Sequence, residues 1–281
     1  RSTLFPYTTL FRSGSCLFLF WSWIRGSALF HPVRFLRDFR RFFLDWSKFN
    51  AENGRKSFHV GWRNLYPCWE DWNASACTLS YYFWQDLWAA RKIFMARPPV
   101  HFDIASRVDG FIAHLLCFMP VTMLDIRPLP WQIEGLDFIR ADATNLEQIE
   151  DNSIHSLSSL CAVEHFGLGR YGDPIEPEAC FRVMNAMQRV LAPGGRLYLA
   201  VPVGEDGVAF NAHRVFAPDT IIKSFNHLQL VDFAVIDARD TGHVLYREHV
   251  EIEQFKADFD FWGSVIGLFE FVKGTLHRGE V

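Results

Sequence analysis

The sequence predicts an α/β domain in which a mostly parallel sheet carries helices on both faces, preceded by aromatic-rich helices. From residue 100 onward, short apolar runs alternate with amphipathic helical patterns, which is typical of parallel strands joined by helices. The earlier part of the chain has a different composition, because eight of the ten tryptophans precede residue 100. We therefore interpret the two parts separately.

Length and composition exclude several classes of protein. The chain has 281 residues, of which 49% are hydrophobic and 21% charged, so it can bury a sizeable core and is not a disordered chain. Its net charge of -4 provides no general basic surface, and we expect no nucleic acid among its partners. The six cysteines form no C-x-x-C pair and no zinc-like cluster with histidines, so we expect no metal site. Free thiols suit a reducing compartment, which predicts a cytoplasmic protein.

Domain boundaries follow from these changes of pattern. Residues 3–13 resemble a translated sequencing adapter, so we expect residues 1–13 to be an artefact and the natural beginning of the protein to be missing. The remaining boundaries define an aromatic-rich helical extension at 14–79, the α/β domain at 80–273 and a frayed tail at 274–281.

A basic, aromatic helix is predicted to begin at Pro32, a residue that suits the first turn of a helix. Its apolar side chains recur at spacings of three and four, on one stripe: Leu36, Phe39, Phe43, Trp46 and Phe49. Two interpretations stay open. The helix packs on its own domain with a solvated basic face, or residues 32–49 make a peripheral contact with an anionic membrane.

The α/β part is predicted to begin with a helix over residues 80–94. The apolar positions that we expect on its packed face are Phe83, Leu87, Ala90 and Phe94. Strands are predicted at residues 100–104, 121–125, 136–140, 154–160 and 196–201, and helices at 108–118 and 178–191. Residues 193–195 (PGG) are expected to end the second of these helices.

Carboxylates follow the ends of these strands, where open parallel sheets bind their ligands. Asp125 ends the second strand, about 20 residues after the first turn, and could accept two hydrogen bonds from ribose hydroxyls. Asp142 follows the third strand and could accept a hydrogen bond from an adenine amino group. The alternatives are that Asp125 caps a loop and that Asp142 is a helix N-cap.

These motifs, taken in order, resemble a known family. The set comprises Asp103, Asp125, Asp142, Glu164, His165 and residues 191–195 (LAPGG). It is similar to the motifs of class I S-adenosylmethionine-dependent methyltransferases. Residues 158–174 and 210–216 resemble, more narrowly, an uncharacterised bacterial family linked to surface-polysaccharide biosynthesis. The likeness runs from about Tyr82 to Lys273.

The resemblance implies a Rossmann-like, seven-stranded sheet with an antiparallel last strand, and S-adenosylmethionine as cofactor. Residues 228–237 and 265–273 would then form the final hairpin, with 239–259 as a charged insertion between them. The residues implied to bind the cofactor are Asp103, Ala105, Ser106, Gly110, Asp125, Ile126, Asp142, Ala143 and Leu160. Asp103 could instead tie down the first loop, and Gly110 could serve helix packing.

The resemblance also places the methyl acceptor beside Glu164 and His165. These are the catalytic candidates, because a histidine with a pKa near neutrality can deprotonate a hydroxyl. The alternative is a hydrogen-bonded structural pair. The candidates for substrate binding are Tyr171, His213 and Arg214. The last two could meet an anionic substrate or form a structural salt bridge. The Gly-rich residues 167–174 could close over the site as a lid.

The first loop departs from the family pattern. Methyltransferases usually carry glycines there, but Ala105 and Arg107 take the first two glycine positions and Asp109 and Gly110 follow. This departure predicts weakened, reshaped or abolished cofactor binding. The predicted function is methyl transfer to a small hydroxyl or amine acceptor, with a sugar or polysaccharide precursor as one candidate. The alternative is a catalytically inactive binding or scaffold module with the same fold.

Overall fold

The computed structural model describes residues 32–67, 79–240 and 244–274. The chain divides between residues 78 and 79 into two compact units, and each is described by itself. The predicted artefact at residues 1–13 lies outside the described residues, as does almost all of the predicted tail.

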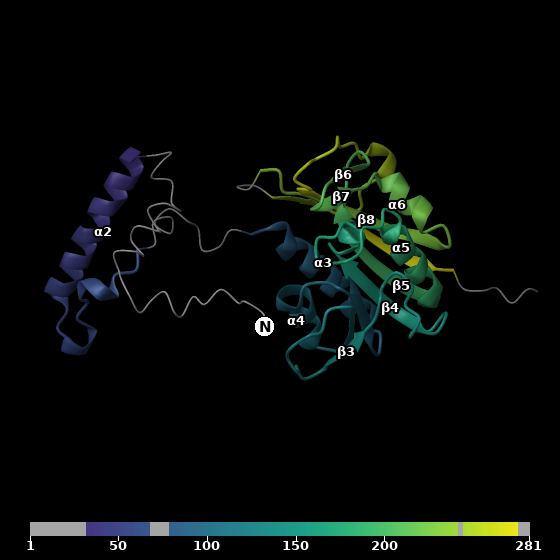
Figure 1. Ribbon diagram of the computed structural model, residues 1–281, viewed down its shortest axis with the longest axis horizontal. Helices are drawn as coiled ribbons and strands as arrows, with labels where there is room; N and C mark the ends of the chain where they lie inside the picture. The colour runs from purple at the N-terminus through teal and green to yellow at the C-terminus, as the bar shows by residue number, and fades with distance from the viewer. Residues whose placement is uncertain (1–31, 68–78, 241–243, 275–281) are drawn as a thin grey trace, which may run out of the picture. The chain divides into compact units, whose positions relative to one another are not determined.

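The described part of the first unit is a helix followed by two short turns (Figure 1). The helix α2 (Pro32–Glu52) begins at the predicted proline. The Trp46 indole and the Asn50 amide both donate to the Val60 carbonyl, at 2.8 and 2.9 Å, so the chain after α2 folds back onto the helix. Within the described residues, none of the helices has the length and apolar character that crossing a bilayer requires.

The second unit is built on one eight-stranded sheet with the strand order β3-β2-β1-β4-β5-β10-β8-β9 (Figure 1). The strands are β1 (His101–Ile104), β2 (Val121–Asp125), β3 (Leu136–Arg140), β4 (Ile154–Leu160), β5 (Leu191–Pro202), β8 (Leu228–Asp237), β9 (Leu245–Arg247) and β10 (Val265–Lys273). The first five strands are parallel to one another. A separate two-stranded hairpin is formed by β6 (Gly207–Ala209) and β7 (His213–Val215).

The predicted antiparallel final strand is confirmed. β10 lies between β5 and β8 and runs antiparallel to both, with Phe269 opposite Leu199 on one side and Phe233 on the other. The predicted number of seven strands is wrong, because β9 adds an eighth strand at the edge, beside β8. β9 lies in the charged segment expected to be an insertion, and three residues are too few for an alternating pattern to be visible.

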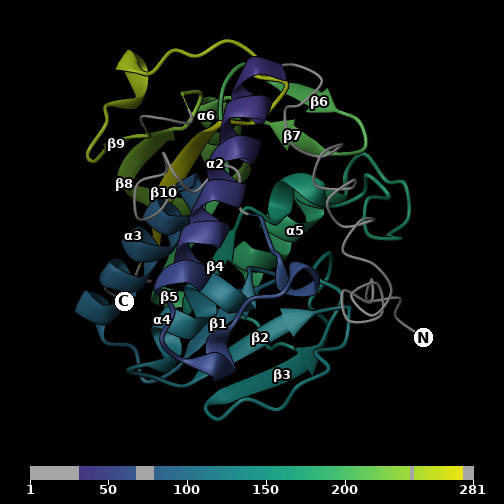
Figure 2. The ribbon, with the colours of Figure 1, turned by 90° about the vertical axis from the view of Figure 1, so that its left-hand side faces the viewer.

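Helices cover both faces of the sheet, as Figures 1 and 2 show. On one face, α3 (Tyr81–Ala96) and α4 (Ala113–Leu116) pack into a core that includes Ile93, Phe111 and Tyr198. On the other, α5 (Ala179–Val190) and α6 (Pro218–Ser224) pack into a second core. The predicted helix at 108–118 is shorter than expected and starts with a π-helical turn at Val108–Ile112. The PGG stretch expected to end α5 lies inside β5.

The prediction for the packed face of α3 is wrong in part, although Ala90 is buried as expected. Phe83 and Phe94 are exposed, whereas Gln85 and Asp86 are buried. The buried polar groups are satisfied, because the Gln85 amide donates to Asp86 Oδ1 at 3.1 Å and the Cys161 thiol donates to Gln85 Oε1 at 3.0 Å. The helix therefore packs through a polar contact with the loop after β4.

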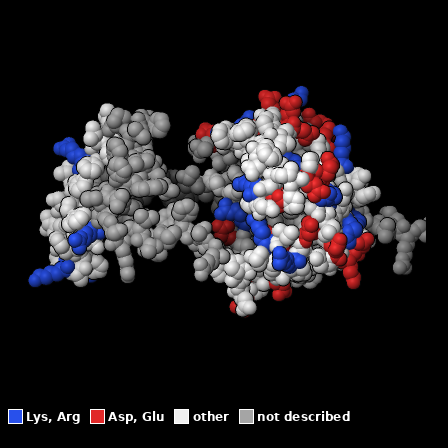
Figure 3. All heavy atoms as spheres, viewed as in Figure 1, with Lys and Arg blue, Asp and Glu red and all other residues white. Residues whose placement is uncertain are grey.

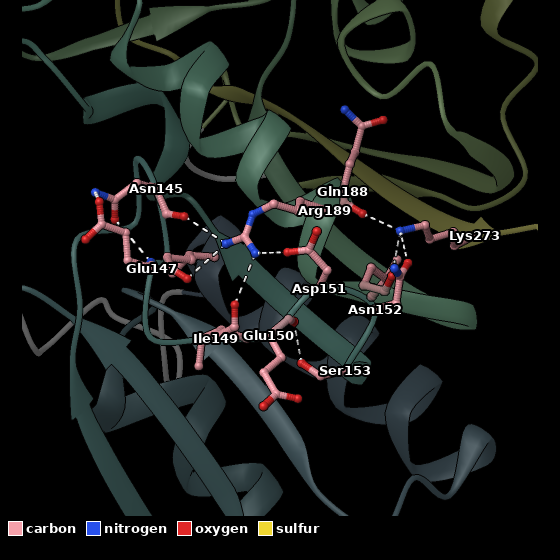
Figure 4. Close-up of polar contacts among 12 residues, drawn as sticks. Asn145, Glu147, Ile149, Glu150, Asp151, Asn152, Ser153, Gln188, Arg189 and Lys273 are labelled. Carbon is pink, nitrogen blue, oxygen red and sulfur yellow. Dashed lines mark hydrogen bonds and ion pairs between the residues drawn. The ribbon is translucent and has the colours of Figure 1, made fainter.

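The connection between β3 and β4 is fastened to the end of α5 (Figure 4). The Arg189 guanidinium donates to the carbonyl oxygens of Asn145 and Ile149, at 2.9 and 3.1 Å, and pairs with the Asp151 carboxylate. Asp142 is the second residue of this connection, which follows β3, so Arg189 holds the part of the connection that lies farther along the chain from the carboxylate.

Replacing Arg189 by methionine is expected to lower the free energy of unfolding by about 2 kcal/mol, because several carbonyls lose a charged donor at once. Urea denaturation measures this. The matched control is Arg182→Met on the same helix, which removes an exposed ion pair with Glu176 and should lower the stability clearly less. Equal losses for the two variants would show that Arg189 is not a structural clamp.

Charges of both signs are spread over the face of the second unit in Figure 3, with Lys and Arg side chains among Asp and Glu side chains. This mixture agrees with the small net charge of -4. Electrostatic recognition therefore depends on individual groups within a site and not on a broad field.

Candidate functional site

A cavity opens at the carboxyl ends of the parallel strands, over the point between β1 and β4 where the strand order reverses. Its volume is about 780 Å³. Ala105 and Ser106 line it after β1, Asp125 at the end of β2 and Asp142 after β3. The two carboxylates that the sequence singled out therefore share one cavity wall.

Most of the predicted site residues line this cavity. The predicted cofactor residues among them are Ala105, Ser106, Asp125, Ile126, Asp142, Ala143 and Leu160. The predicted catalytic and substrate residues among them are Glu164, His165, Tyr171 and His213. Three predicted residues do not reach it: Asp103, Gly110 and Arg214.

Asp103 lies beneath the first loop and is fully buried, so it cannot touch a ligand in the cavity. Its Oδ1 accepts the Ser106 N–H at 2.9 Å, and its Oδ2 accepts the hydroxyls of Ser106 and Ser158 at 2.7 and 2.5 Å. Burial raises the pKa of Asp103 to about 6, although these donors oppose the shift. The geometry supports the interpretation that Asp103 ties down the first loop.

A buried histidine, His101, is connected to Asp103 through the hydroxyl of Ser158. His101 Nδ1 lies 2.7 Å from the Ser156 hydroxyl, and its Nε2 lies 2.8 Å from the Ser158 hydroxyl. The Ser158 hydroxyl donates its hydrogen bond to Asp103, so it must accept one from His101 Nε2–H. His101 Nδ1 then carries no hydrogen and accepts a hydrogen bond from the Ser156 hydroxyl. Burial lowers the pKa of His101 to about 3, so the ring is neutral. The chain of hydrogen bonds therefore has a defined direction.

The first loop keeps its shape without the usual glycines. Ala105 adopts the left-handed backbone conformation with φ of 57°, and its N–H donates to the Leu124 carbonyl at 3.1 Å. The Ser106 hydroxyl accepts the Leu160 N–H at 2.9 Å, which joins the loop to the end of β4. Hydrogen bonds thus fix a turn that glycine usually favours.

Arg107 and Asp109, which belong to the stretch where the first loop departs from the glycine pattern, form a pair with each other. Arg107 Nε and Nη2 lie 3.0 and 2.7 Å from the Asp109 carboxylate. The guanidinium also stacks over the Tyr82 ring, 4.6 Å from its centroid. The charge that this loop adds is therefore neutralised within the loop itself.

Asp125 is almost buried, and a neighbouring arginine holds its carboxylate. Asp125 Oδ1 accepts the Arg127 backbone N–H at 2.8 Å and Nε at 3.1 Å, and Oδ2 accepts Nη2 at 2.8 Å. Each carboxylate oxygen can accept two hydrogen bonds, so Oδ2 keeps one open position. The Arg127 guanidinium also stacks on Tyr171, 4.6 Å from the ring centroid, which links β2 to the loop after β4.

Asp142 is exposed and belongs to a tight turn. Its Oδ1 accepts the backbone N–H and the hydroxyl of Thr144, at 2.9 and 2.8 Å. The contact agrees with the capping alternative, since the same oxygen closes the turn after β3. Capping through Oδ1 does not exclude ligand contact, because Asp142 also lines the cavity.

Glu164 and His165, which follow β4, bring an acid and a base to the lining of the cavity. Glu164 is buried, and burial raises its pKa to about 8; its Oε2 has no hydrogen-bond partner among the described residues. His165 Nδ1 donates to the Ala212 carbonyl at 2.7 Å, which leaves the Nε2 lone pair 3.6 Å from Glu164 Oε1. Burial, with the nearby Arg170 charge, lowers the pKa of His165 to about 4. At neutral pH the carboxyl is therefore protonated and the imidazole is neutral.

The expected ligand contacts of Arg214 and Gly110 are not found. The buried Arg214 guanidinium donates to the carbonyls of Phe166 and Pro177, at 2.6 and 3.1 Å, and so fastens the loop after β4. A Cβ on Gly110 would lie 2.3 Å from Asp86 Oδ2, so this glycine allows close packing against α3. Arg170 also lines the cavity but is not among the predicted site residues, because nothing in its Gly-rich sequence surroundings distinguishes it.

Comparison with known proteins gives one family match. Residues 134–236 match a family described as "Caenorhabditis protein of unknown function, DUF268". No curated protein is similar enough to the chain to count as a match. The bacterial polysaccharide family suggested by the sequence has no counterpart in these findings, so that narrower assignment stays a prediction.

Solved structures similar to this chain include methyltransferases. One is the 1,6-didemethyltoxoflavin-N1-methyltransferase of Burkholderia thailandensis with bound 1,6-didemethyltoxoflavin and S-adenosylhomocysteine: 16% identity, 86% of this chain and 90% of that chain covered, TM-score 0.48. Another is the N-methyltransferase NodS of Bradyrhizobium japonicum in complex with S-adenosylhomocysteine: 10% identity, 83% and 98% covered, TM-score 0.46. Likenesses at this level assign no activity to the chain.

Proposed function

We propose that the second unit binds S-adenosylmethionine and transfers its methyl group to a hydroxyl or amine of a small acceptor. The observation that carries this proposal is the cavity of about 780 Å³ at the switch point of the sheet, with Asp125 and Asp142 in one wall. The ribose hydroxyls and adenine amino group of the cofactor are donors, and carboxylates accept from such groups.

The residues present fit a nucleoside at this wall. Asp125 Oδ2 keeps one open acceptor position, and Asp142 caps its turn through Oδ1 alone. Ile126 and Ala143 line the same wall and offer apolar contact for a base. The backbone of the first loop, at Ala105 and Ser106, would face the amino-acid end of the cofactor.

When bound, S-adenosylmethionine supplies an electrophilic methyl group on a sulfonium, which an acceptor attacks in line. The protein positions the acceptor and takes its proton. His165 is the base in this proposal, because its Nε2 lone pair is free of the Ala212 contact that occupies Nδ1. Glu164, protonated at neutral pH, donates a hydrogen bond to the acceptor through Oε2, the carboxyl oxygen that has no hydrogen-bond partner among the described residues. The resemblance of residues 158–174 and 210–216 is the basis for a sugar or polysaccharide precursor as acceptor, and the free thiols are the basis for a cytoplasmic location.

Titration calorimetry with S-adenosylhomocysteine tests the cofactor. We expect the full chain to bind it, and Asp125→Ala to weaken binding at least tenfold. The matched control is Asp137→Ala, which alters an exposed aspartate on β3 that does not line the cavity. Failure of the unaltered protein to bind millimolar S-adenosylhomocysteine would contradict the proposal.

A catalytically silent binding module is the second candidate. It is favoured by the Arg127 fork, the pair of hydrogen bonds that the Arg127 guanidinium donates to the Asp125 carboxylate. If this fork blocks the carboxylate, Arg127→Ala should bind S-adenosylhomocysteine where the unaltered protein does not. If the ligand displaces Arg127 from Asp125, the unaltered protein and Arg127→Ala should bind S-adenosylhomocysteine with affinities within a few-fold of one another.

A peripheral membrane contact of α2 is a separate proposal. Val33, Leu36, Leu44 and Phe49 are exposed along the helix, together with basic side chains such as Arg40. We expect the chain to bind phosphatidylserine vesicles with an affinity that falls as salt rises, and Arg37→Gln/Arg40→Gln to bind more weakly. Binding that is equal to neutral vesicles, or unchanged in the variant, would remove this proposal.

A further inference from the structure

In the part of the chain that the structure describes, Arg170 differs from the other arginines that line the cavity because it has no carboxylate partner. Three lining arginines form ion pairs: Arg107 with Asp109, Arg127 with Asp125, and Arg182 with Glu176. Within the described residues, no carboxylate lies within ion-pair distance of Arg170. Its Nη1 donates to the Ala212 carbonyl at 2.9 Å, and its side chain is exposed to the cavity mouth. Its positive charge is therefore available to a ligand.

The groups around Arg170 leave this charge unneutralised. Its Nη1 lies 3.2 and 3.4 Å from the two ring nitrogens of His165, and His213 lines the same side of the cavity. Burial and the Arg170 charge lower the pKa of both imidazoles, so both rings are neutral at neutral pH. The Glu164 carboxyl is protonated at neutral pH, because burial raises its pKa to about 8 although the Arg170 charge acts to lower it.

The remaining acids nearby are occupied with backbone donors. The Asp173 carboxylate accepts the N–H groups of Gly167, Gly169 and Tyr171, at 2.9, 3.2 and 3.1 Å. Asp260 accepts from the Trp262 and Ser264 backbones, at 3.0 and 2.7 Å. These contacts shape the loops around the cavity and direct the acids toward the main chain.

We propose that Arg170 binds a carboxylate or phosphate group carried by the methyl acceptor, so that the acceptor is an anion. The assignment to the acceptor rests on the proposed function, in which Glu164 and His165 mark the acceptor side and the first loop marks the amino-acid end of the cofactor. A guanidinium binds either anion through a two-pronged hydrogen bond.

The position of Arg170 also restricts the acceptor. Its Nη1 is 3.4 Å from His165 Nε2, the atom that takes the proton. An acceptor anchored by its anion at Arg170 therefore presents to the imidazole a hydroxyl or amine that lies only a few bonds from that anion. Hydroxy acids, amino acids, uronates and sugar phosphates have this chemistry, whereas neutral glycosides do not.

Titration calorimetry of the full chain with inorganic phosphate, and separately with acetate, tests the anion site. We expect weak binding of both ions by the unaltered protein, at least tenfold weaker binding by Arg170→Gln, and an intermediate value for Arg170→Lys, which keeps the charge but not the fork. The matched control, Arg182→Gln, alters a lining arginine that is already paired with Glu176 and should bind as the unaltered protein does. Equal binding by Arg170→Gln would overturn the proposal.

A second titration series, in saturating S-adenosylhomocysteine, shows whether the anion that Arg170 binds belongs to the acceptor or to the cofactor. Binding of phosphate that persists beside this ligand supports an acceptor anion. Loss of phosphate binding would assign Arg170 to the carboxylate of the cofactor and overturn the proposal. Absence of S-adenosylhomocysteine binding itself, with phosphate still bound through Arg170, would defeat the proposed methyl transfer and leave an anion-binding cavity, so the two failures are distinct.

Discussion

Gly167→Ala is expected to lower the free energy of unfolding by about 3 kcal/mol or more and to abolish ligand binding. Gly167 has a φ of 76°, and a Cβ there would lie 1.9 Å from the Glu176 carbonyl oxygen and 2.9 Å from Ala179 Cβ. These atoms belong to the backbone and to the first turn of α5, so neither can move cheaply. The loop carries Arg170 and Tyr171, so its displacement disturbs the cavity as well.

Urea denaturation and phosphate titration measure the two effects of Gly167→Ala. The matched control is Gly172→Ala in the same loop. Gly172 also has a positive φ, of 83°, but among the described residues other than its chain neighbours no atom lies within 4 Å of the position that a Cβ would take. The control should lose about 1 kcal/mol from backbone strain alone. Similar losses for the two variants would show that the close contact with Glu176 is not maintained in solution.

Glu164→Gln is expected to remove a large pH dependence of stability. The pKa of Glu164 is raised from 4.5 to about 8 by burial in the folded protein, while the unfolded chain ionises near the lower value. Between these values the unfolded state loses its proton and the folded state keeps it. The free energy of unfolding therefore falls as pH rises through this window, by up to about 1.4 kcal/mol per pH unit.

Denaturation curves at several pH values between 5 and 8 test this expectation. The stability of the unaltered protein should fall relative to Glu164→Gln across the window, because glutamine cannot ionise. Glu150→Gln, at an exposed position on the connection before β4, is the matched control and should keep the pH dependence of the unaltered protein. Parallel curves for the unaltered protein and Glu164→Gln would mean that Glu164 ionises normally.

The sequence predicted the parallel strands well because their signals are local. The buried strand β2 reads as a largely apolar run, and helix α5 shows a clear periodic stripe. The packed face of α3 could not be predicted in this way. Its buried side includes Gln85 and Asp86, and the reason is a hydrogen bond from Cys161, far away in the sequence.

The candidate site was predicted in part for the same reason. Asp125 and Asp142 follow strand ends, and sheet topology alone brings such positions together. Whether a residue lines the cavity or holds the loops beneath it depends on the direction of its side chain. The spacing of residues in the sequence carries no information about that direction. Asp103 and Arg214 turn to backbone and hydroxyl partners under the loops, while Arg170 turns to the cavity.

The position of β10 has a consequence for biosynthesis. β10 lies between β5 and β8 but follows both of them in the chain, so the ribosome makes it after both of its neighbours. Until β10 emerges, the nascent chain exposes one unpaired edge on β5 and another on β8. Such edges promote association between chains, and long-range strand pairing is slow. We therefore expect the newly made protein to depend on chaperones during the interval before this strand inserts.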